Sequence, residues 1–275
     1  MPKTKVLITV KTYPSLSVKY DELVCTAGFR EDGTWIRIYP VAFRKKTYGE
    51  QYEKYTWIEI DLEKNKSDFR PESYRPHSYE SEIETIGKID RKHWEERKKL
   101  VLNKVYDDLS ELILEAHDEH ICTSLAVFKP TKIVNFKIEE VAREWDKEKL
   151  VKLDAERLKK DMFKNEESPF KIVKKLPYKF SYVLEDTKGK KSTMMIEDWE
   201  IGQLYWNCLK KAKGDEKIAC EKVKEKYFEF FVNKRDLYLF LGTTKQNHYV
   251  SKNPFVIIGV FYPPIGNEAK QVTLF

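Results

Sequence analysis

The segment LVCTAGFREDGTWIRIY, residues 23–39, carries the most direct information about the fold. Residues 23–29 and 35–39 are rich in apolar, β-branched and aromatic side chains, and Glu31-Asp32-Gly33-Thr34 lies between them. An Asp-Gly pair favours the positive φ angles that a tight hairpin turn requires. The segment therefore predicts an antiparallel β-hairpin near the start of the chain.

A second strand signal follows at residues 57–63, where apolar and polar side chains alternate. This alternation places Ile58, Ile60 and Leu62 on one face of a strand and leaves Trp57, Glu59, Asp61 and Glu63 on the other. Residues 65–89 lack such periodicity and contain prolines and serines, so we expect a long connection there. Residues 1–64 are therefore expected to be β-rich.

The middle of the chain, residues 90–165, is expected to be mainly helical. Apolar residues recur at three- and four-residue steps from Val101 to Ala116, which predicts an amphipathic helix over residues 91–116. Short strands are expected at residues 124–128 and 132–138. A highly charged helix over residues 139–163 should follow them.

Residues 166–264 mix both kinds of structure. We expect a hairpin from residues 178–184 and 192–196, a helix from Ile201, a second helix after Gly214-Asp215, and two final apolar strands at 237–241 and 255–262. The predicted fold class is therefore α+β. It consists of one globular body, residues 1–264, that is β-rich at both ends with amphipathic helices between, and of a flexible segment at residues 265–275.

Composition excludes several classes of protein. Hydrophobic residues make up 41% of the 275 residues, which excludes intrinsic disorder. The 51 Lys and Arg against 45 Asp and Glu give a net charge of +6, which permits a polyanionic partner without requiring one. No apolar run approaches the ~18 residues of a membrane span, so no membrane partner is expected. The four cysteines form no CxxC pair, and we expect reduced thiols and a cytoplasmic location.

The sharpest partner signal is the segment Gln271-Val272-Thr273-Leu274-Phe275. It resembles the bacterial sliding-clamp-binding peptides, written Gln-x-x-Leu-Phe, with Val272 where Leu is more common. The resemblance implies that Leu274 and Phe275 fill an apolar pocket of a DNA sliding clamp while the Gln271 amide fixes the register. It implies a role in bacterial defence, mobile elements or DNA repair. The alternative is that this segment forms an edge strand or packs into the protein's own core.

A nucleic-acid surface is predicted on the strand at residues 35–39. Alternation places Trp35, Arg37 and Tyr39 on one face, which supplies aromatic rings for base stacking with a cation between them. The alternative is an ordinary aromatic-rich sheet packed beneath a helix. DNA or RNA is the expected partner, and the phosphate contacts are assigned to nearby residues: Lys11, Tyr13, Arg44, Lys45 and Lys46.

The last two strands, residues 237–244 and 255–262, resemble the late strands of PUA-like barrels, the group that includes EVE, YTH and ASCH domains. The likeness rests on an apolar strand, a polar loop and an Ile-Gly-Val strand. It implies a PUA-like barrel that binds RNA or modified bases. The Gly-x-Lys-x-x-Glu pattern of ASCH domains is not present.

Carboxylates offer an enzymatic alternative. Asp61 and Glu63 share a strand face, and Asp198 and Glu200 lie at a strand-to-helix junction, so two acidic pairs would hold Mg²⁺ for phosphodiester hydrolysis if they converged. The alternative is that Asp198 is a helix N-cap and that the strand acids form a solvated face. Mg²⁺ is expected as a cofactor only if the protein is a metal-dependent nuclease. No other cofactor is assigned.

His117, His120 and Cys122 lie close together in the sequence and supply three side chains of the kinds that bind zinc. No fourth ligand lies at a local spacing, and a helix end followed by a buried cysteine explains these residues without a metal, so we assign none. The functional classes that remain are therefore a nucleic-acid-binding protein recruited by a clamp, a metal-dependent nuclease, and a small-molecule or protein-interaction module.

Overall fold

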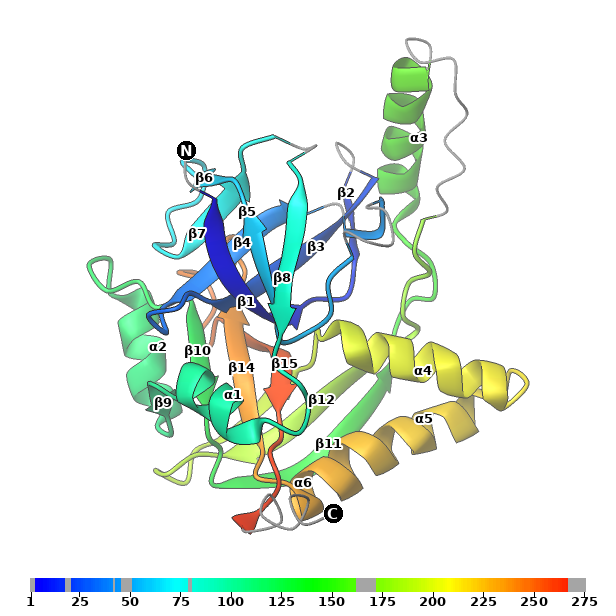
Figure 1. Ribbon diagram of the computed structural model, residues 1–275. Coiled ribbons are helices and arrows are strands. Elements are labelled where there is room, and N and C mark those ends of the chain that lie inside the picture. The colour runs from blue at the N-terminus through cyan, green and yellow to red at the C-terminus, as the bar shows by residue number, and fades with distance from the viewer. Residues whose placement is uncertain are drawn as a thin grey trace, which may run out of the picture.

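The computed structural model describes residues 3–17, 21–41, 43–45, 51–78, 81–161 and 172–266 (Figure 1). The fold is α+β, as predicted, with strands that form three sheets and helices that lie around them. No described helix is long and apolar enough to cross a membrane.

The first sheet has eight strands in the order β6-β7-β4-β3-β1-β5-β8, with β2 paired to β3, and it is called the eight-stranded sheet below. Its hairpin of β3 and β4 confirms the first prediction, since Gly33 adopts a φ of 78°. The Asp32 carboxylate also accepts a hydrogen bond from the Thr34 amide at 2.9 Å. The strands are β1 (Thr4–Lys11), β2 (Ser15–Ser17), β3 (Asp21–Phe29), β4 (Trp35–Val41), β5 (Thr56–Ile60), β6 (Leu62–Lys64), β7 (Ser73–Pro76) and β8 (Ile83–Lys88).

The other two sheets come from the second part of the chain. A four-stranded sheet has the order β15-β14-β10-β9, and a three-stranded sheet has the order β11-β12-β13. A bridge between Ile196 and Ile257 joins them. Their strands are β9 (Val105–Tyr106), β10 (Leu125–Phe128), β11 (Lys132–Glu140), β12 (Tyr178–Glu185), β13 (Lys191–Met195), β14 (Tyr238–Thr243) and β15 (Phe255–Phe261).

Helices surround these sheets. Asp108, Asp198 and Asp215 cap the N-termini of α2, α4 and α5 by accepting hydrogen bonds from first-turn amides. Helices α4 and α5 lie side by side, and α3 projects from the body (Figure 1). The helices are η1 (Phe43–Lys45), α1 (Trp94–Val101), α2 (Leu109–His117), α3 (Lys147–Asp161), α4 (Trp199–Lys211), α5 (Glu216–Lys224), the π-helical η3 (Glu225–Phe230) and α6 (Phe231–Lys234).

Four local predictions were wrong. The expected single strand over residues 57–63 is two strands, because β5 ends at Ile60 and pairs with β1 and β8, whereas β6 begins at Leu62 and pairs with β7. The expected single helix over residues 91–116 is two helices, because β9 lies between them and pairs in parallel with β10. Residues 65–89 contain β7 and β8 and are not only a connection. The charged helix begins at Lys147, since β11 continues to Glu140. The other predicted hairpin, the α4 and α5 helices and the last two strands are confirmed.

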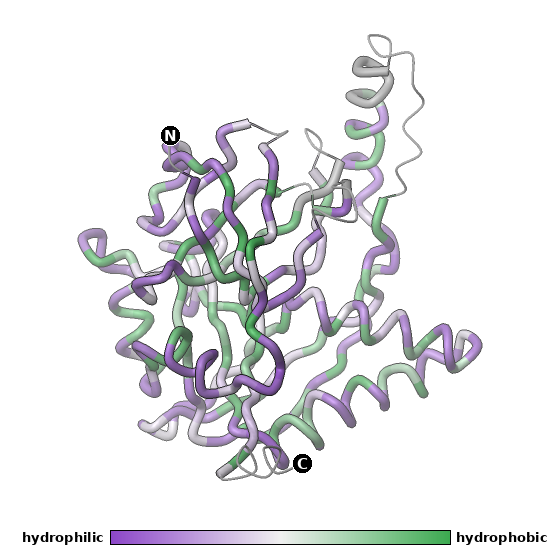
Figure 2. Tube along the Cα trace, viewed as in Figure 1, coloured by the Kyte–Doolittle hydropathy of each residue, from purple (hydrophilic) through white to green (hydrophobic). Residues whose placement is uncertain are grey.

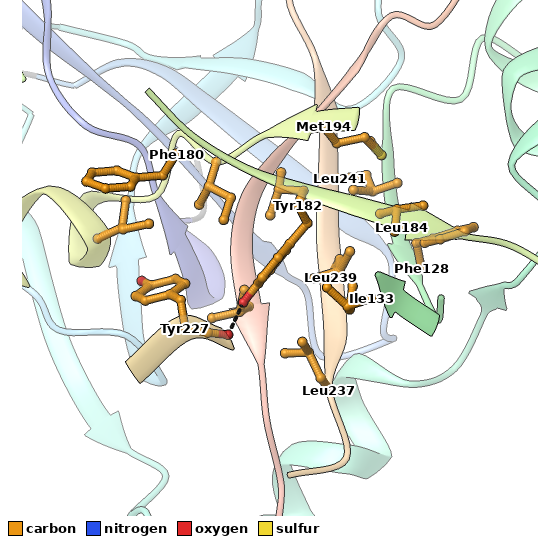
Figure 3. Packing of buried hydrophobic residues seen from close by; sticks show 14 of the residues in the cluster. Phe128, Ile133, Phe180, Tyr182, Leu184, Met194, Tyr227, Leu237, Leu239 and Leu241 are labelled. Atoms are coloured by element: carbon orange, nitrogen blue, oxygen red, sulfur yellow. Dashed lines mark hydrogen bonds between the residues drawn. The ribbon is translucent and has the colours of Figure 1, made fainter. Parts of the chain in front are cut away.

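The core continues through both parts of the chain. Apolar residues follow the central strands, whereas the helices alternate apolar and polar residues along their length (Figure 2). The largest cluster lies between the second-part sheets and helices, where the buried Tyr182 hydroxyl donates a hydrogen bond to the Tyr227 carbonyl (Figure 3). Another cluster joins Leu7 and Phe29 of the eight-stranded sheet to Phe240 and Phe261 of the four-stranded sheet. The eight-stranded and four-stranded sheets therefore share one interior.

Candidate functional site

A cavity of about 720 Å³ lies among the three sheets. Its wall includes residues from β3, β4, the ends of β12 and β13, and β14 and β15. This volume lies within the range of about 300–1,000 Å³ typical of small-molecule and cofactor sites. The cavity is therefore the candidate functional site.

Arg37 of β4 is the most deeply buried cation at the cavity, at 2% exposure. Its guanidinium donates to the Ser124 hydroxyl at 2.7 Å, to the Ser124 carbonyl at 3.1 Å and to the Thr243 carbonyl at 3.4 Å. These acceptors are neutral, and burial lowers the pKa of Arg37. The contacts join the eight-stranded sheet to β10 and β14 and leave a positive charge beside the cavity.

Arg70 is the second buried cation that lines the cavity. It forms an ion pair of 2.6 Å with Asp68, and it also donates to the Thr243 carbonyl. Burial acts to raise the pKa of Asp68, but the hydrogen bonds and charge of Arg70 outweigh it and lower this pKa to about 2. Asp68 also accepts from the Ser73 hydroxyl at 2.8 Å. This carboxylate therefore stays ionised and fixes Arg70 in place.

Four aromatic residues line the cavity: Tyr13, Tyr39, Trp145 and Tyr178. The Tyr13 hydroxyl donates to the Lys174 carbonyl at 2.8 Å and accepts from the Trp206 indole at 2.8 Å. The Trp145 indole donates to the Val173 carbonyl at 2.8 Å. The Tyr178 hydroxyl donates to Glu216 at 2.8 Å. The fourth aromatic residue is Tyr39, with 36% exposure.

The remaining charges of the wall are three lysines and one carboxyl group. Lys175, Lys179 and Lys245 join the two arginines, so the described lining contains five cations. Glu197 is the only carboxylate in the same lining, and burial raises its pKa. Lys179 also pairs with Glu139 at 3.0 Å. Asp68 and Glu139 pair with Arg70 and Lys179, so the remaining charges are Arg37, Lys175 and Lys245 against Glu197. The wall thus combines aromatic surface with a net positive charge, which suits a flat anionic ligand.

The predicted stacking strand contributes to this site, but it is not an open platform. Arg37 and Tyr39 line the cavity, as does Tyr13. Trp35 is partly buried and packs against the core, where its ring centroid lies 3.9 Å from that of Phe29 and 5.6 Å from that of Phe240. The face that alternation identified is therefore covered by the four-stranded sheet, and only part of it borders the cavity.

The predicted phosphate-binding residues are dispersed. Lys11 is buried, donates to the Tyr52 carbonyl at 3.0 Å and lies 4.4 Å from the Phe43 ring centroid. Burial is the main reason that its pKa is lowered to about 8. The structure therefore places Lys11 in an aromatic enclosure inside the protein. Arg44 and Lys45 belong to η1, and Lys46 lies outside the described residues.

The two acidic pairs of the nuclease hypothesis are not brought together. Residue Ile60, beside Asp61, pairs with Thr4 at the start of β1, whereas Asp198 bridges to Thr12 beyond its end. Eight residues of strand separate these points by about 25 Å. Glu63 pairs with Arg75.

Asp198 caps the N-terminus of α4, which agrees with the interpretation of this residue as a helix N-cap. It is completely buried and forms an ion pair with Lys54 at 2.8 Å, and Glu200 lies 3.3 Å from the same ammonium. The pair joins the loop before β5 to the start of α4. Its geometry therefore accounts for these carboxylates as structural groups.

The structure contains a buried contact between Cys122 and His248 that the sequence did not predict. The Cys122 thiol lies 3.5 Å from the His248 imidazole, which also shares a 2.7 Å hydrogen bond with Thr243. The two residues are 126 positions apart, and no short spacing signals their contact. His120 of the zinc hypothesis is exposed, and the described residues contain no group of three metal-binding side chains.

The predicted clamp-binding residues Gln271, Leu274 and Phe275 lie outside the described residues.

Comparison of the sequence with known protein families identifies two matches. Residues 2–103 match a family described as Domain of unknown function (DUF8758), and residues 106–275 match one described as Domain of unknown function (DUF8757). Among curated proteins the chain has no match. Because the second match covers more than half of the chain, the protein belongs to the DUF8757 family.

Proposed function

We propose that the protein binds single-stranded nucleic acid and accommodates one nucleotide in the cavity among the three sheets. The observation that carries this proposal is the composition of the cavity wall, with four aromatic residues and five cations against one carboxylate in its described lining. Base stacking on aromatic rings contributes ~1–3 kcal/mol per base, and cations that follow the backbone supply the rest of the affinity.

The size and shape of the cavity favour a single nucleotide over a duplex. A volume of about 720 Å³ holds one base with its sugar and phosphate, whereas a double helix is too wide to enter. An unstacked base is available in a single strand without the cost of opening a pair. We therefore expect single strands to bind more tightly than duplexes of the same sequence.

The segment Gln271–Phe275 completes the proposal as the element that recruits the protein to DNA. A peptide of this kind needs only micromolar affinity, about 8 kcal/mol, because a clamp on DNA raises the local concentration of the attached body. Recruitment and cavity binding would thus be separate functions of separate residues.

The test of cavity binding is fluorescence anisotropy with labelled single-stranded DNA and RNA oligonucleotides. Trp145→Ala should weaken binding by about 5- to 150-fold, which corresponds to the loss of one stacking contact. Alanine at Lys175, Lys179 and Lys245 together should reduce the slope of log K against log salt by about 2, or 0.7 per lost phosphate contact. Thermal melts establish that each variant is folded.

The matched control is Lys224→Ala on α5, a helix that does not contribute to the cavity wall. It removes one positive charge, as each cavity lysine substitution does, and should leave both affinity and salt slope unchanged. A loss of affinity per removed charge that is equal in Lys224→Ala and in the cavity lysine variant would mean that binding is only a response to net charge. No binding of any single strand at low salt would refute the proposed function.

Recruitment is tested by capture of the protein on an immobilised bacterial sliding clamp. Leu274→Ala with Phe275→Ala should abolish capture and leave oligonucleotide binding unchanged. Trp145→Ala should do the reverse. Capture that survives the loss of both apolar side chains would refute the clamp-binding role of this segment.

A further inference from the structure

Glu197 is a partly buried carboxyl of the cavity wall, and its surroundings differ from those of three buried carboxylates, Asp198, Asp68 and Asp186. Asp198 pairs with Lys54, Asp68 pairs with Arg70, and Asp186 accepts hydrogen bonds from three backbone amides, those of residues 109, 188 and 190. In the described part of the chain the Glu197 carboxyl forms no hydrogen bond and no ion pair, although it lines the cavity. A hydrogen-bond acceptor in a cavity wall that the protein itself leaves without a partner is a candidate for ligand contact.

The backbone of Glu197 is held on both sides. Its amide donates to the Ile257 carbonyl at 2.7 Å, and its carbonyl accepts from the Tyr13 amide at 2.8 Å. The preceding residue, Ile196, bridges to the same strand, β15. The carboxyl is thus attached to a fixed point of the wall, next to the aromatic Tyr13.

The chemistry of the acceptor limits the ligands that satisfy it. An ionised carboxyl only accepts hydrogen bonds, whereas a protonated one also donates. As a carboxylate, Glu197 suits an N–H donor at the edge of a flat ring held between aromatic walls. Adenine, cytosine and guanine carry an exocyclic amine on that edge. Uracil and thymine carry carbonyl oxygens on either side of their single ring N–H, and these oxygens repel a carboxylate.

We propose that Glu197 selects the nucleobase in the cavity by accepting a hydrogen bond from an exocyclic amine, and that it discriminates against uracil and thymine. This inference rests on the proposed nucleic-acid function and specifies the ligand of the same site. A well-placed polar contact to a base edge typically changes affinity by 5- to 150-fold, or about 1–3 kcal/mol. The basic and aromatic residues of the wall would then supply affinity, and Glu197 would supply selectivity.

The test uses oligonucleotides of deoxyuridine with a single central cytosine, adenine or guanine, compared with the uniform deoxyuridine strand of equal length and charge. Anisotropy with the wild-type protein should show at least fivefold tighter binding of one or more amine-bearing strands. If guanine is preferred, replacement by hypoxanthine, which lacks only the exocyclic amine, should remove the preference.

Glu197→Gln identifies the residue responsible. Its side-chain amide has similar size but also donates, so it pairs with a carbonyl oxygen of uracil as well as with an amine. The variant should bind deoxyuridine strands more tightly and lose the preference for the amine. Glu221→Gln on α5, an exposed carboxylate outside the cavity, is the control and should retain the wild-type preference.

The outcomes separate the two proposals. Tight binding of all strands with equal affinity would overturn the role of Glu197 and leave the proposed function intact. A preference that persists in Glu197→Gln would overturn the assignment to this residue. Failure of every strand to bind would overturn the nucleic-acid function together with the inference that rests on it.

Discussion

Removal of the Lys54 ammonium should destabilise the protein strongly. Lys54 lies 2.8 Å from an Asp198 carboxylate oxygen, and the side chains of the two residues are 7% and 0% exposed. Lys54→Met keeps the length and apolar stem of the side chain but leaves Asp198 buried without its counter-charge. Breaking one partner of a buried ion pair typically costs about 3–5 kcal/mol. For a chain of this size the melting temperature should fall by roughly 6–15 °C.

The loss of stability in Lys54→Met should increase with pH. Burial raises the pKa of Asp198 to about 6, while the charge of Lys54 lowers it. Without Lys54 the folded pKa of Asp198 rises further above its unfolded value of about 3.9. Between these two values the unfolded state releases the proton that the folded state retains, so the stability of the variant falls as pH increases. The deficit against wild type should be largest near pH 8 and smaller at pH 5.

Urea denaturation at pH 5, 6.5 and 8 measures this deficit. Lys5→Met is the matched control, because Lys5 pairs with Glu31 at 2.6 Å but the two side chains are 37% and 65% exposed. Such a pair contributes about 0–1 kcal/mol, and its loss should be small. A Lys54→Met deficit below 1 kcal/mol, or one that is equal at pH 5 and pH 8, would refute the reasoning.

Two further predictions concern the cavity and the buried thiol. Gly202→Ala places a Cβ atom 2.3 Å from a ring carbon of Tyr13, so it should destabilise the protein by about 1–3 kcal/mol and weaken oligonucleotide binding; unchanged melting and affinity would contradict the contact. Burial raises the pKa of Cys122 and lowers that of His248, so the pair should stay neutral and the thiol should react more slowly with iodoacetamide at pH 7.5 than after denaturation. Peptide mapping by mass spectrometry checks this, and rapid native labelling would indicate a thiolate.

Local signals predicted the elements that depend on neighbouring residues. The Asp32-Gly33 turn identified the hairpin, alternation identified the buried face of β5, and Asp198 was recognised as an N-cap. The interrupted helix could not be predicted in this way. Its break depends on the pairing of Val105 with Val127, which are distant in sequence.

The candidate site was predicted only in part, for the same reason. Alternation placed Trp35, Arg37 and Tyr39 on one face but did not indicate what covers that face. Arg37 contacts Thr243, which is 206 positions away. Glu197 directly precedes Asp198 of the predicted junction, but sequence alone does not show that Asp198 is paired while the Glu197 carboxyl is not.

The contacts of Arg37 also bear on how the chain is inherited. The DUF8758 and DUF8757 matches end and begin at residues 103 and 106, yet Arg37 from the first segment holds Ser124 and Thr243 from the second. The cluster around Phe29 and Phe240 crosses the same boundary. A polypeptide cleaved at this boundary would yield two fragments, each exposing an apolar face that the other fragment normally covers. Recombination that separates the segments would therefore be disfavoured, and lineages should transmit them as a pair.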